Sequence, residues 1–265
     1  MSAVSYDQIM REVDPVLRDL VPTYLAHRTR DLEALHEAVQ RDDFRAISVI
    51  AHNLQGSGGS FGFSALTDLG VAISRAARER NRPELARQVA LLEEFLSEAR
   101  AAERAAASVP KPIPVAAAPP VALAPGARAE ILVVDDQEMS ATVIRRYLAR
   151  EGYPLRWLAS GDAALAAMDG APLPALVLLD VVMPGMNGFE VCRRIKSNPV
   201  TCGVPVVLVT ACDERSELMQ AWASGADDVL AKPVRRDELV KRVQSLLQAA
   251  RQAARSRSGL TTAPG

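Results

Sequence analysis

Residues 176–196 read LVLLDVVMPGMNGFEVCRRIK, in which a continuously apolar run ends at Asp180 and a Pro-Gly turn leads into an amphipathic segment. The apolar run predicts a buried strand, and the segment after the turn predicts a helix. Similar strand and helix patterns alternate on both sides of this stretch. Because most of these strands are apolar throughout, residues from about 129 onward are predicted to form an open, doubly wound parallel sheet covered by helices on both faces.

The predicted elements of this sheet are short and regularly spaced. We expect strands at 130–134, 155–158, 175–179, 205–209 and 228–230, with helices near 138–151, 161–169, 187–197, 214–224 and 235–250.

Polar side chains come directly after four of the five predicted strands. They are Asp135 and Asp136 after the first strand, Asp180 after the third, Thr210 after the fourth and Lys232 after the fifth. Open α/β sheets bind ligands at the carboxyl ends of their strands. We therefore expect three carboxylates, a hydroxyl and an ammonium group to meet in one crevice.

Three carboxylates repel one another unless a cation lies among them, and oxygen ligands favour magnesium or calcium. Mg²⁺ is the better candidate, since proteins usually hold it with one or two carboxylates, waters and a phosphate. In this interpretation Asp180 is a nucleophile toward a phosphoryl group, while Lys232 and Thr210 contact the transferring oxygens. Acidic residues after strands also serve as helix N-caps. That alternative does not explain the lysine and threonine at matching depths.

Four motifs in this half of the chain resemble those of response-regulator receiver domains. They are ILVVDDQE at 131–138, the opening stretch at 176–196, VVLVTA at 206–211 and GADDVLAKPV at 225–234. The resemblance covers about Ala129 to Ala250 and implies a flavodoxin-like (βα)5 fold with five parallel strands. It also implies a site in which Asp135, Asp136, Asp180 and the backbone carbonyl of Val182 bind magnesium, Asp180 is phosphorylated, and Thr210 and Lys232 contact the phosphoryl group. A cis Lys232-Pro233 peptide is implied as well.

Two positions depart from that family pattern. Val229 stands where many receivers carry a tyrosine or phenylalanine that moves inward with the threonine. Val182 stands where many carry a polar side chain that helps to position hydrolytic water. Both differences affect the steps after phosphorylation rather than phosphorylation itself.

In the N-terminal half, the stretch AHNLQGSGGSFGF at 51–63 places a histidine on a predicted helix beside several glycines. On a 3.6-residue period His52 lies away from the apolar stripe, so its imidazole is expected to face water. Each glycine costs a helix roughly 0.5–1 kcal/mol relative to alanine. The cluster therefore suggests that a partner surface comes close to His52, although a Gly/Ser-rich run is also typical of a turn.

The region from about Tyr6 to Ala102 resembles a histidine phosphotransfer (HPt) domain, a helical bundle whose signature histidine carries phosphate. The positions that match are His52, Leu54, Gly56, Ser57, Gly58, Gly59, Gly62 and Leu66. Gln55 stands where lysine is common in the family, so it supplies no positive charge. We expect an all-α four-helix bundle with helical runs at 16–39, interrupted near Pro22, around His52, and at 66–80 and 83–104.

The predicted organisation is therefore two domains joined by a tether. Residues 1–104 form the HPt bundle, 105–128 an Ala/Pro-rich linker, 129–250 the receiver and 251–265 a disordered tail. The linker sequence PKPIPVAAAPP favours extended, polyproline-like states, and tethering raises the effective concentration of one site at the other.

Composition and sequence pattern argue against several classes of function. A formal charge of −1 over 265 residues and a sparse set of arginines near the end do not predict nucleic-acid binding. No apolar run reaches the roughly 18 residues that predict a membrane-spanning helix. The three cysteines lack metal-type spacing and are expected to be reduced thiols of a cytoplasmic protein.

The predicted function is two-component phosphorelay signalling with His52 and Asp180 as phosphorylated residues. The expected partners are a sensor histidine kinase, simple or hybrid, and other receiver or HPt proteins, with output by protein contact. The chain is expected to be a phosphotransfer protein without a kinase domain rather than a metabolic enzyme. The alternative is a non-enzymatic adaptor or phosphate sink in which Gln55 and Val229 mark altered relay function. The direction of flow between His52 and Asp180 stays open.

Overall fold

The computed structural model describes residues 10–259 except 12, 108–129, 171 and 212–214. The chain divides into two compact units, residues 1–127 and 128–265. The linker predicted at 105–128 lies almost wholly outside the described residues. Among the helices that the structure describes, none is long and apolar enough to cross a membrane.

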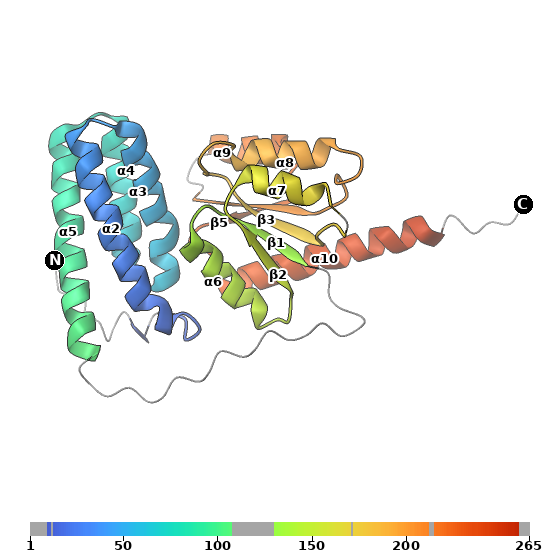
Figure 1. The fold of residues 1–265 in the computed structure, drawn as a ribbon, viewed down its shortest axis with the longest axis horizontal. Coiled ribbons are helices and arrows are strands. Elements are labelled where there is room, and N and C mark those ends of the chain that lie inside the picture. The colour runs from blue at the N-terminus through green and yellow to red at the C-terminus, as the bar shows by residue number, and fades with distance from the viewer. Residues whose placement is uncertain (1–9, 12, 108–129, 171, 212–214, 260–265) are drawn as a thin grey trace, which may run out of the picture. The chain divides into compact units, whose positions relative to one another are not determined.

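The first unit is a helical bundle (Figure 1). Its described elements are a short 3-10 helix η1 (Arg18–Leu20), α2 (Val21–Gln40), α3 (Phe44–Gly58), a 3-10 turn η2 (Gly59–Phe61), α4 (Ser64–Arg78) and α5 (Arg82–Ala107). The first long helix differs from the expected run at 16–39. Pro22 lies in the first turn of α2, where its missing N–H costs nothing, so it begins the helix instead of interrupting it.

The bundle core is apolar with an aromatic centre. The ring of Tyr24 stacks on Phe61 at a centroid distance of 4.2 Å and lies 5.6 Å from Phe63. The apolar stripe predicted for α3 is buried at Ile47, Ala51 and Leu54. These contacts hold one face of α3 against the rest of the bundle.

The second unit is a five-stranded parallel sheet. Its elements are β1 (Ile131–Val134), α6 (Glu138–Ala149), β2 (Leu155–Leu158), α7 (Gly161–Met168), β3 (Leu176–Asp180), α8 (Gly188–Ser197), β4 (Val206–Thr210), α9 (Arg215–Ala223), β5 (Asp228–Ala231) and α10 (Arg236–Gly259). The strand order is β2-β1-β3-β4-β5, the flavodoxin-like order. The expected fold class is confirmed.

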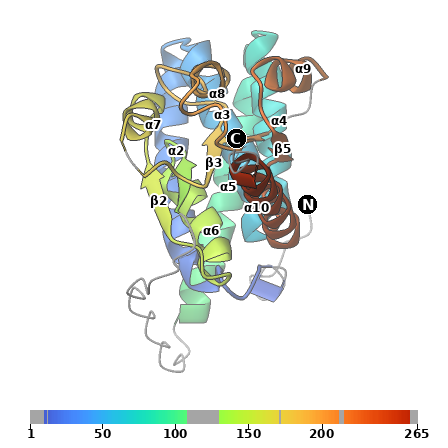
Figure 2. The same cartoon turned by 90° about the vertical axis from the view of Figure 1, so that its right-hand side faces the viewer.

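Helices cover both faces of this sheet. In two perpendicular views α6 and α10 lie side by side on one face, and α7, α8 and α9 cover the other (Figures 1 and 2). The residues of β1, β3 and β4 are all buried, which explains why the strands are continuously apolar.

Two predicted helix ends are too early by three residues or more. The helix expected to end at 104 continues to Ala107 as α5. The helix expected to end at 250 continues to Gly259 as α10, through part of the segment predicted to be a disordered tail. Residues 250–256 read ARQAARS, and alanine and arginine are strong helix formers, which favours continuation of α10 through this segment.

Candidate functional site

The parallel register brings the polar residues to one edge of the sheet. Val134 pairs with Leu179, so Asp135 and Asp180 are next in line on neighbouring strands. Thr210 ends β4, and the backbone N–H of Lys232 donates to the Thr210 carbonyl at 2.7 Å. The Lys232-Pro233 peptide is cis, as the family resemblance implies.

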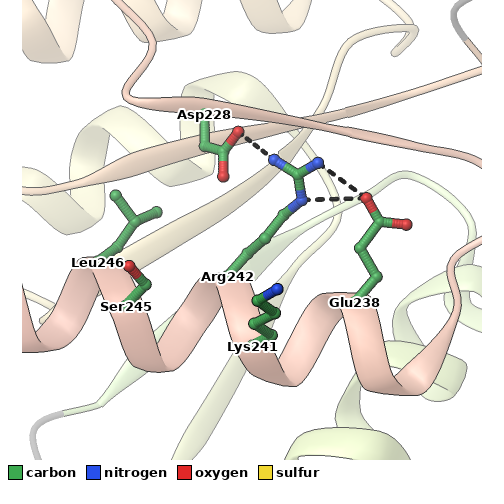
Figure 3. A pocket seen from close by; sticks show the side chains of 6 residues that line it. All are labelled: Asp228, Glu238, Lys241, Arg242, Ser245 and Leu246. Carbon is green, nitrogen blue, oxygen red and sulfur yellow. Dashed lines mark hydrogen bonds and ion pairs between the residues drawn. The ribbon is translucent and has the colours of Figure 1, made fainter.

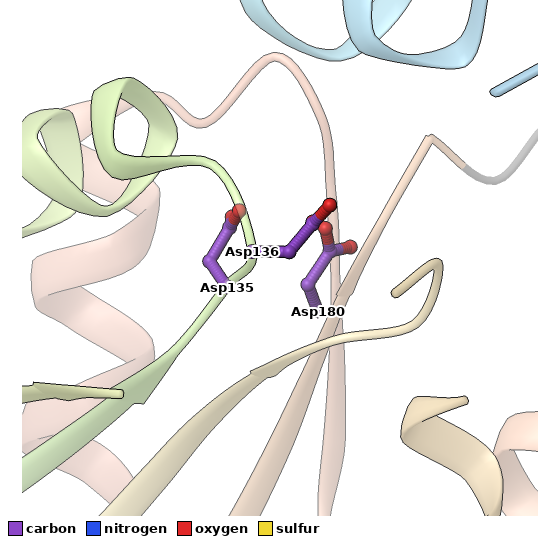
Figure 4. Close-up of side chains that lie close together, drawn as sticks. All are labelled: Asp135, Asp136 and Asp180. Atoms are coloured by element: carbon purple, nitrogen blue, oxygen red, sulfur yellow. The ribbon is translucent and has the colours of Figure 1, made fainter. Parts of the chain in front are cut away.

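Three carboxylates meet at this edge. Asp135, Asp136 and Asp180 each offer an oxygen, and these oxygens lie within 4.8 Å of one another (Figure 4). Asp135 and Asp180 are about 1% exposed. An oxygen-only donor set of this size and charge suits a hard divalent cation, so the residues present fit the magnesium site that the sequence predicts.

Lys232 supplies the positive charge of the cluster. Its Nζ donates to Asp180 Oδ2 at 2.9 Å and to Asp135 Oδ2 at 3.4 Å, and the side chain is 3% exposed. Burial alone would lower the pKa of Lys232, but the Asp180 and Asp135 carboxylates outweigh burial and hold that pKa above its ordinary value. The lysine is therefore a charged, fixed donor beside the Asp180 carboxylate.

The single positive charge of Lys232 does not neutralise the three negative charges of the ionised carboxylates. Burial is the main reason that the pKa of Asp135 rises to about 7, with Lys232 opposing that rise and Asp180 adding to it. Burial also raises the pKa of Asp136 to about 6, and Asp180 adds to the rise. The ionised cluster is thus unfavourable near neutral pH without a further cation.

This electrostatic imbalance predicts a pH effect on the metal-free receiver unit. Native pKa values above the ordinary 3.8 mean that the stabilisation from neutral Asp135 and Asp136 is complete below about pH 4. It is lost as pH rises through about 6 to 7. We expect the free energy of unfolding to fall by about 3 kcal/mol between roughly pH 5 and pH 8, most of it from Asp135. Urea unfolding followed by tryptophan emission checks this, because both tryptophans, Trp157 and Trp222, lie in this unit.

The variant Asp136→Asn is the control for this pH effect. It keeps the side-chain volume and removes one charge, so the loss between the two pH values becomes smaller. Magnesium should also flatten the profile in the wild type. A wild-type stability that rises over the same interval would contradict the assignment of raised pKa values.

Thr210 and Val182 complete the surroundings of Asp180. The Thr210 hydroxyl donates to Glu217 Oε2 on α9 at 3.4 Å, a contact that the sequence did not predict. The Val182 N–H donates to Asp180 Oδ1 at 3.4 Å. The Thr210 hydroxyl and the Asp180 carboxylate are therefore both held by neighbouring groups, one from α9 and one from the loop after β3.

A second polar cluster lies between β5 and α10 (Figure 3). Arg242 bridges Asp228 of β5 and Glu238 of α10, and its Nη2 donates to Glu238 at 2.8 Å. The hydrogen bonds to Asp228 and Glu238 raise the pKa of Arg242. The guanidinium of Arg242 pairs with the two carboxylates, so this cluster connects the edge strand β5 to α10.

His52 lies in the other unit, in the second half of α3. Asp43 caps the helix by accepting from the Ala46 N–H at 3.0 Å. His52 is intermediate in exposure, so it reaches the surface less fully than the expected water-facing imidazole.

One glycine near His52 has a packing role that the sequence did not suggest. A Cβ added to Gly58 would lie 2.8 Å from the Phe63 carbonyl oxygen and 2.9 Å from the Thr67 N–H nitrogen. Gly70 of α4, which sequence reasoning missed, is closer still: its added Cβ would lie 2.6 Å from Gln55 N and 2.7 Å from Ala51 O. Gly58 and Gly70 thus serve the packing of α4 against α3. The approach of a partner to the segment around His52 stays a prediction.

Ser57 joins α3 to α2 through a buried polar network. Its hydroxyl donates to the Asn53 carbonyl at 2.7 Å, accepts from Arg28 Nη1 at 3.3 Å and lies 3.3 Å from the Tyr24 hydroxyl. Arg28 is 4% exposed and also pairs with Asp31 at 3.0 Å. The network fixes α2 against the turn of α3 that comes after His52.

The variant Ser57→Ala is expected to lower the free energy of unfolding of the bundle by about 1–2 kcal/mol, because the buried guanidinium of Arg28 loses an acceptor. Circular dichroism follows the helices of both units. Tryptophan emission of the same sample reports on the second unit alone and should not change, so a shift seen only by circular dichroism belongs to the bundle. Ser48→Ala is a matched control, since the Ser48 hydroxyl makes the same bond to a carbonyl one turn back, at 2.8 Å. Equal losses in the two variants would exclude the role of Arg28.

Comparison with known proteins matches each unit separately. The family model described as the response regulator receiver domain matches residues 131–244, and the model described as the Hpt domain matches residues 19–102. Response regulator PleD of Caulobacter vibrioides is 47% identical over 118 residues, which are 44% of this chain and 26% of that protein. The phosphate regulon transcriptional regulatory protein PhoB of Rhizobium meliloti is 37% identical over 122 residues, 46% of this chain and 53% of that protein.

Among solved structures, the signal receiver domain of a signal transduction histidine kinase from Syntrophus aciditrophicus is 30% identical. The match covers 46% of the present chain and 92% of the solved chain, with a TM-score of 0.44. The chain spans between about a quarter and a half of the length of the two curated relatives, 26% and 53%.

Proposed function

Because the chain carries an Hpt domain followed by a response regulator receiver domain, we propose that it is a phosphorelay protein phosphorylated on Asp180 and on His52. The two domains support two-component phosphorelay signalling as its setting. The observation that carries the residue assignment is the cluster of three carboxylates and one lysine at the carboxyl edge of the sheet.

In the proposed reaction an Asp180 carboxylate oxygen attacks the phosphorus of a phosphodonor. A bond forms between that oxygen and phosphorus, and the bond from phosphorus to the donor breaks, with the electron pair leaving on the donor. Lys232 lies 2.9 Å from the Asp180 carboxylate, so its ammonium is placed to offset charge on the transferring oxygens. The Thr210 hydroxyl would exchange Glu217 for one of those oxygens.

Magnesium is the proposed cofactor, held by Asp135, Asp136, Asp180 and the backbone carbonyl of Val182. When bound, it would supply positive charge to the phosphoryl oxygens. The raised pKa values of Asp135 and Asp136 support this proposal, since they indicate that the cluster lacks positive charge by itself.

For the Hpt domain we propose that the His52 imidazole carries phosphate and exchanges it with a receiver aspartate. The partners would be a sensor histidine kinase, simple or hybrid, and other receiver or Hpt proteins, with output through protein contact. A cytoplasmic location fits the three cysteines without metal-type spacing.

The test is phosphorylation of the full chain by a small acyl phosphate with magnesium, and then mapping of the modified residues by mass spectrometry. Wild type should carry phosphate on Asp180, and Asp180→Asn should lose it. Asp162→Asn, an exposed residue at the start of α7, is the matched control and should behave as wild type. Absence of phosphate on Asp180 in the magnesium-loaded wild type would refute the assignment.

The same samples test the His52 half of the proposal. Phosphate on His52 that disappears in Asp180→Asn and in His52→Ala would establish transfer from Asp180 to His52. If His52 stays unmodified, the chain is next mixed with a phosphorylated separate receiver. Failure of His52 to accept phosphate from either source would leave the adaptor interpretation.

A further inference from the structure

One hydrogen bond to the backbone of the carboxylate cluster comes from a residue outside the predicted site. The indole nitrogen Nε1 of Trp157, on the edge strand β2, donates a hydrogen bond of 2.8 Å to the backbone carbonyl of Asp135. Trp157 pairs in register with Val133, two residues before Asp135 on β1, so its side chain lies on the same face of the sheet as Asp135.

This hydrogen bond extends the sheet beyond the end of β2. The Asp135 N–H donates to the Leu158 carbonyl at 3.1 Å, which is the last step of the ladder from β1 to that strand. In a longer parallel ladder the Asp135 carbonyl would accept from the backbone N–H of residue 160. Ser160 is instead the N-cap of α7, and the indole N–H takes that place.

The Asp135 carbonyl belongs to the peptide plane that leads into Asp136. Its orientation therefore sets the direction in which the Asp136 backbone leaves the strand. The Asp135 side chain is held separately, because its Oδ1 accepts from the Gln137 N–H at 2.8 Å. The two hydrogen bonds together fix the short acidic loop from which two of the three carboxylates extend.

We propose that Trp157 is a positioning residue for the metal site, since its indole N–H fixes, through the Asp135 carbonyl, the peptide plane that orients Asp136. The inference rests on the proposed function of the carboxylate cluster as a magnesium site. It assigns to an edge-strand side chain part of the geometry that this site needs.

The chain offers a sharp test because it contains only two tryptophans, Trp157 and Trp222. In a Trp222→Phe background, tryptophan can be replaced throughout by benzothienylalanine, which keeps the shape of the indole and removes its N–H. Trp222 is 53% exposed on α9, so Trp222→Phe alone is the matched reference. Magnesium affinity is measured by calorimetric titration of the full chain.

We expect the benzothienylalanine protein to bind magnesium about 3- to 10-fold more weakly than the Trp222→Phe reference. A purely structural role would lower the urea midpoint without magnesium and leave the magnesium dissociation constant unchanged. The same dissociation constant in both proteins therefore overturns the inference. If the reference protein itself binds no magnesium, the proposed metal site has failed instead, and the two failures are distinguishable.

Trp157→Phe gives a second measure with natural amino acids. It should reproduce the weaker magnesium affinity, and Asp180 should need correspondingly more magnesium to reach half-maximal phosphorylation by the acyl phosphate. A magnesium requirement equal to that of Trp222→Phe would also overturn the inference.

Discussion

Lys232→Met should lower the free energy of unfolding of the receiver domain by about 3 kcal/mol near pH 7.5 without magnesium. The ammonium is buried between Asp180, at 2.9 Å, and Asp135, at 3.4 Å, and its removal leaves three carboxylates with no positive neighbour at those distances among the described residues. Phosphorylation of Asp180 should slow by about 10²- to 10³-fold, because the lysine no longer offsets charge on the transferring oxygens. Urea unfolding monitored by tryptophan emission and labelling with an acyl phosphate measure the two effects.

Lys241→Met on the exposed side of α10 is the matched control for the Lys232 variant. It removes the same charge and should change stability by less than about 0.5 kcal/mol. Magnesium or a pH near 5 should restore part of the stability lost in Lys232→Met, since either one reduces the repulsion among the carboxylates. Equal stability of the two variants would show that Lys232 does not hold the cluster together.

The second large effect is expected for Gly70→Ala in the Hpt domain. The added methyl carbon would lie 2.6 Å from Gln55 N and 2.7 Å from Ala51 O, both backbone atoms that cannot move alone. Helices α3 and α4 would have to separate at the turn that carries His52. Overpacking of this kind costs about 1–3 kcal/mol, more than the gain of roughly 1 kcal/mol in helix propensity. We expect a net loss of up to about 2 kcal/mol in the bundle, measured by circular dichroism with tryptophan emission as the report on the other unit.

The control for Gly70→Ala is Val71→Ala, the next residue of α4, which is 40% exposed. It should leave the bundle within about 0.5 kcal/mol of wild type. Slower phosphate exchange on His52 should accompany the loss in Gly70→Ala. A variant that is more stable than wild type would mean that propensity outweighs the backbone contact, and the close approach of α3 and α4 would then have no energetic importance.

Much of the receiver could be predicted from sequence because its signals are local and repeated. Apolar runs that end in Asp135, Asp180 and Thr210 predict both strands and the edge where they converge, and the parallel register then brings the side chains together. The end of α10 was harder to predict, since nothing in an alanine- and arginine-rich segment stops a helix. The proline at 22 predicted a break but not its position at the start of α2.

Contacts between different elements explain what the sequence did not reveal. Trp157 reaches Asp135 across 22 positions, and Glu217 of α9 reaches Thr210 at the end of β4, so neither residue stands in a local motif. Gly70 did carry a signal, because a glycine inside a helix of good helix formers needs a packing reason. The buried Arg28 had none, since an arginine on an amphipathic helix is usually a solvated residue.

The contact of α4 with the backbone of α3 restricts the movement of the helical segment that carries His52. Where two helices meet through long side chains, rotamer changes let one helix slide over the other. Where they meet backbone to backbone, as at Gly58 and Gly70, the helices have little freedom to shift. We therefore expect substitutions to be tolerated best on the outward faces of both helices, where they can change which partner proteins are recognised. The histidine would present the same geometry to each of them.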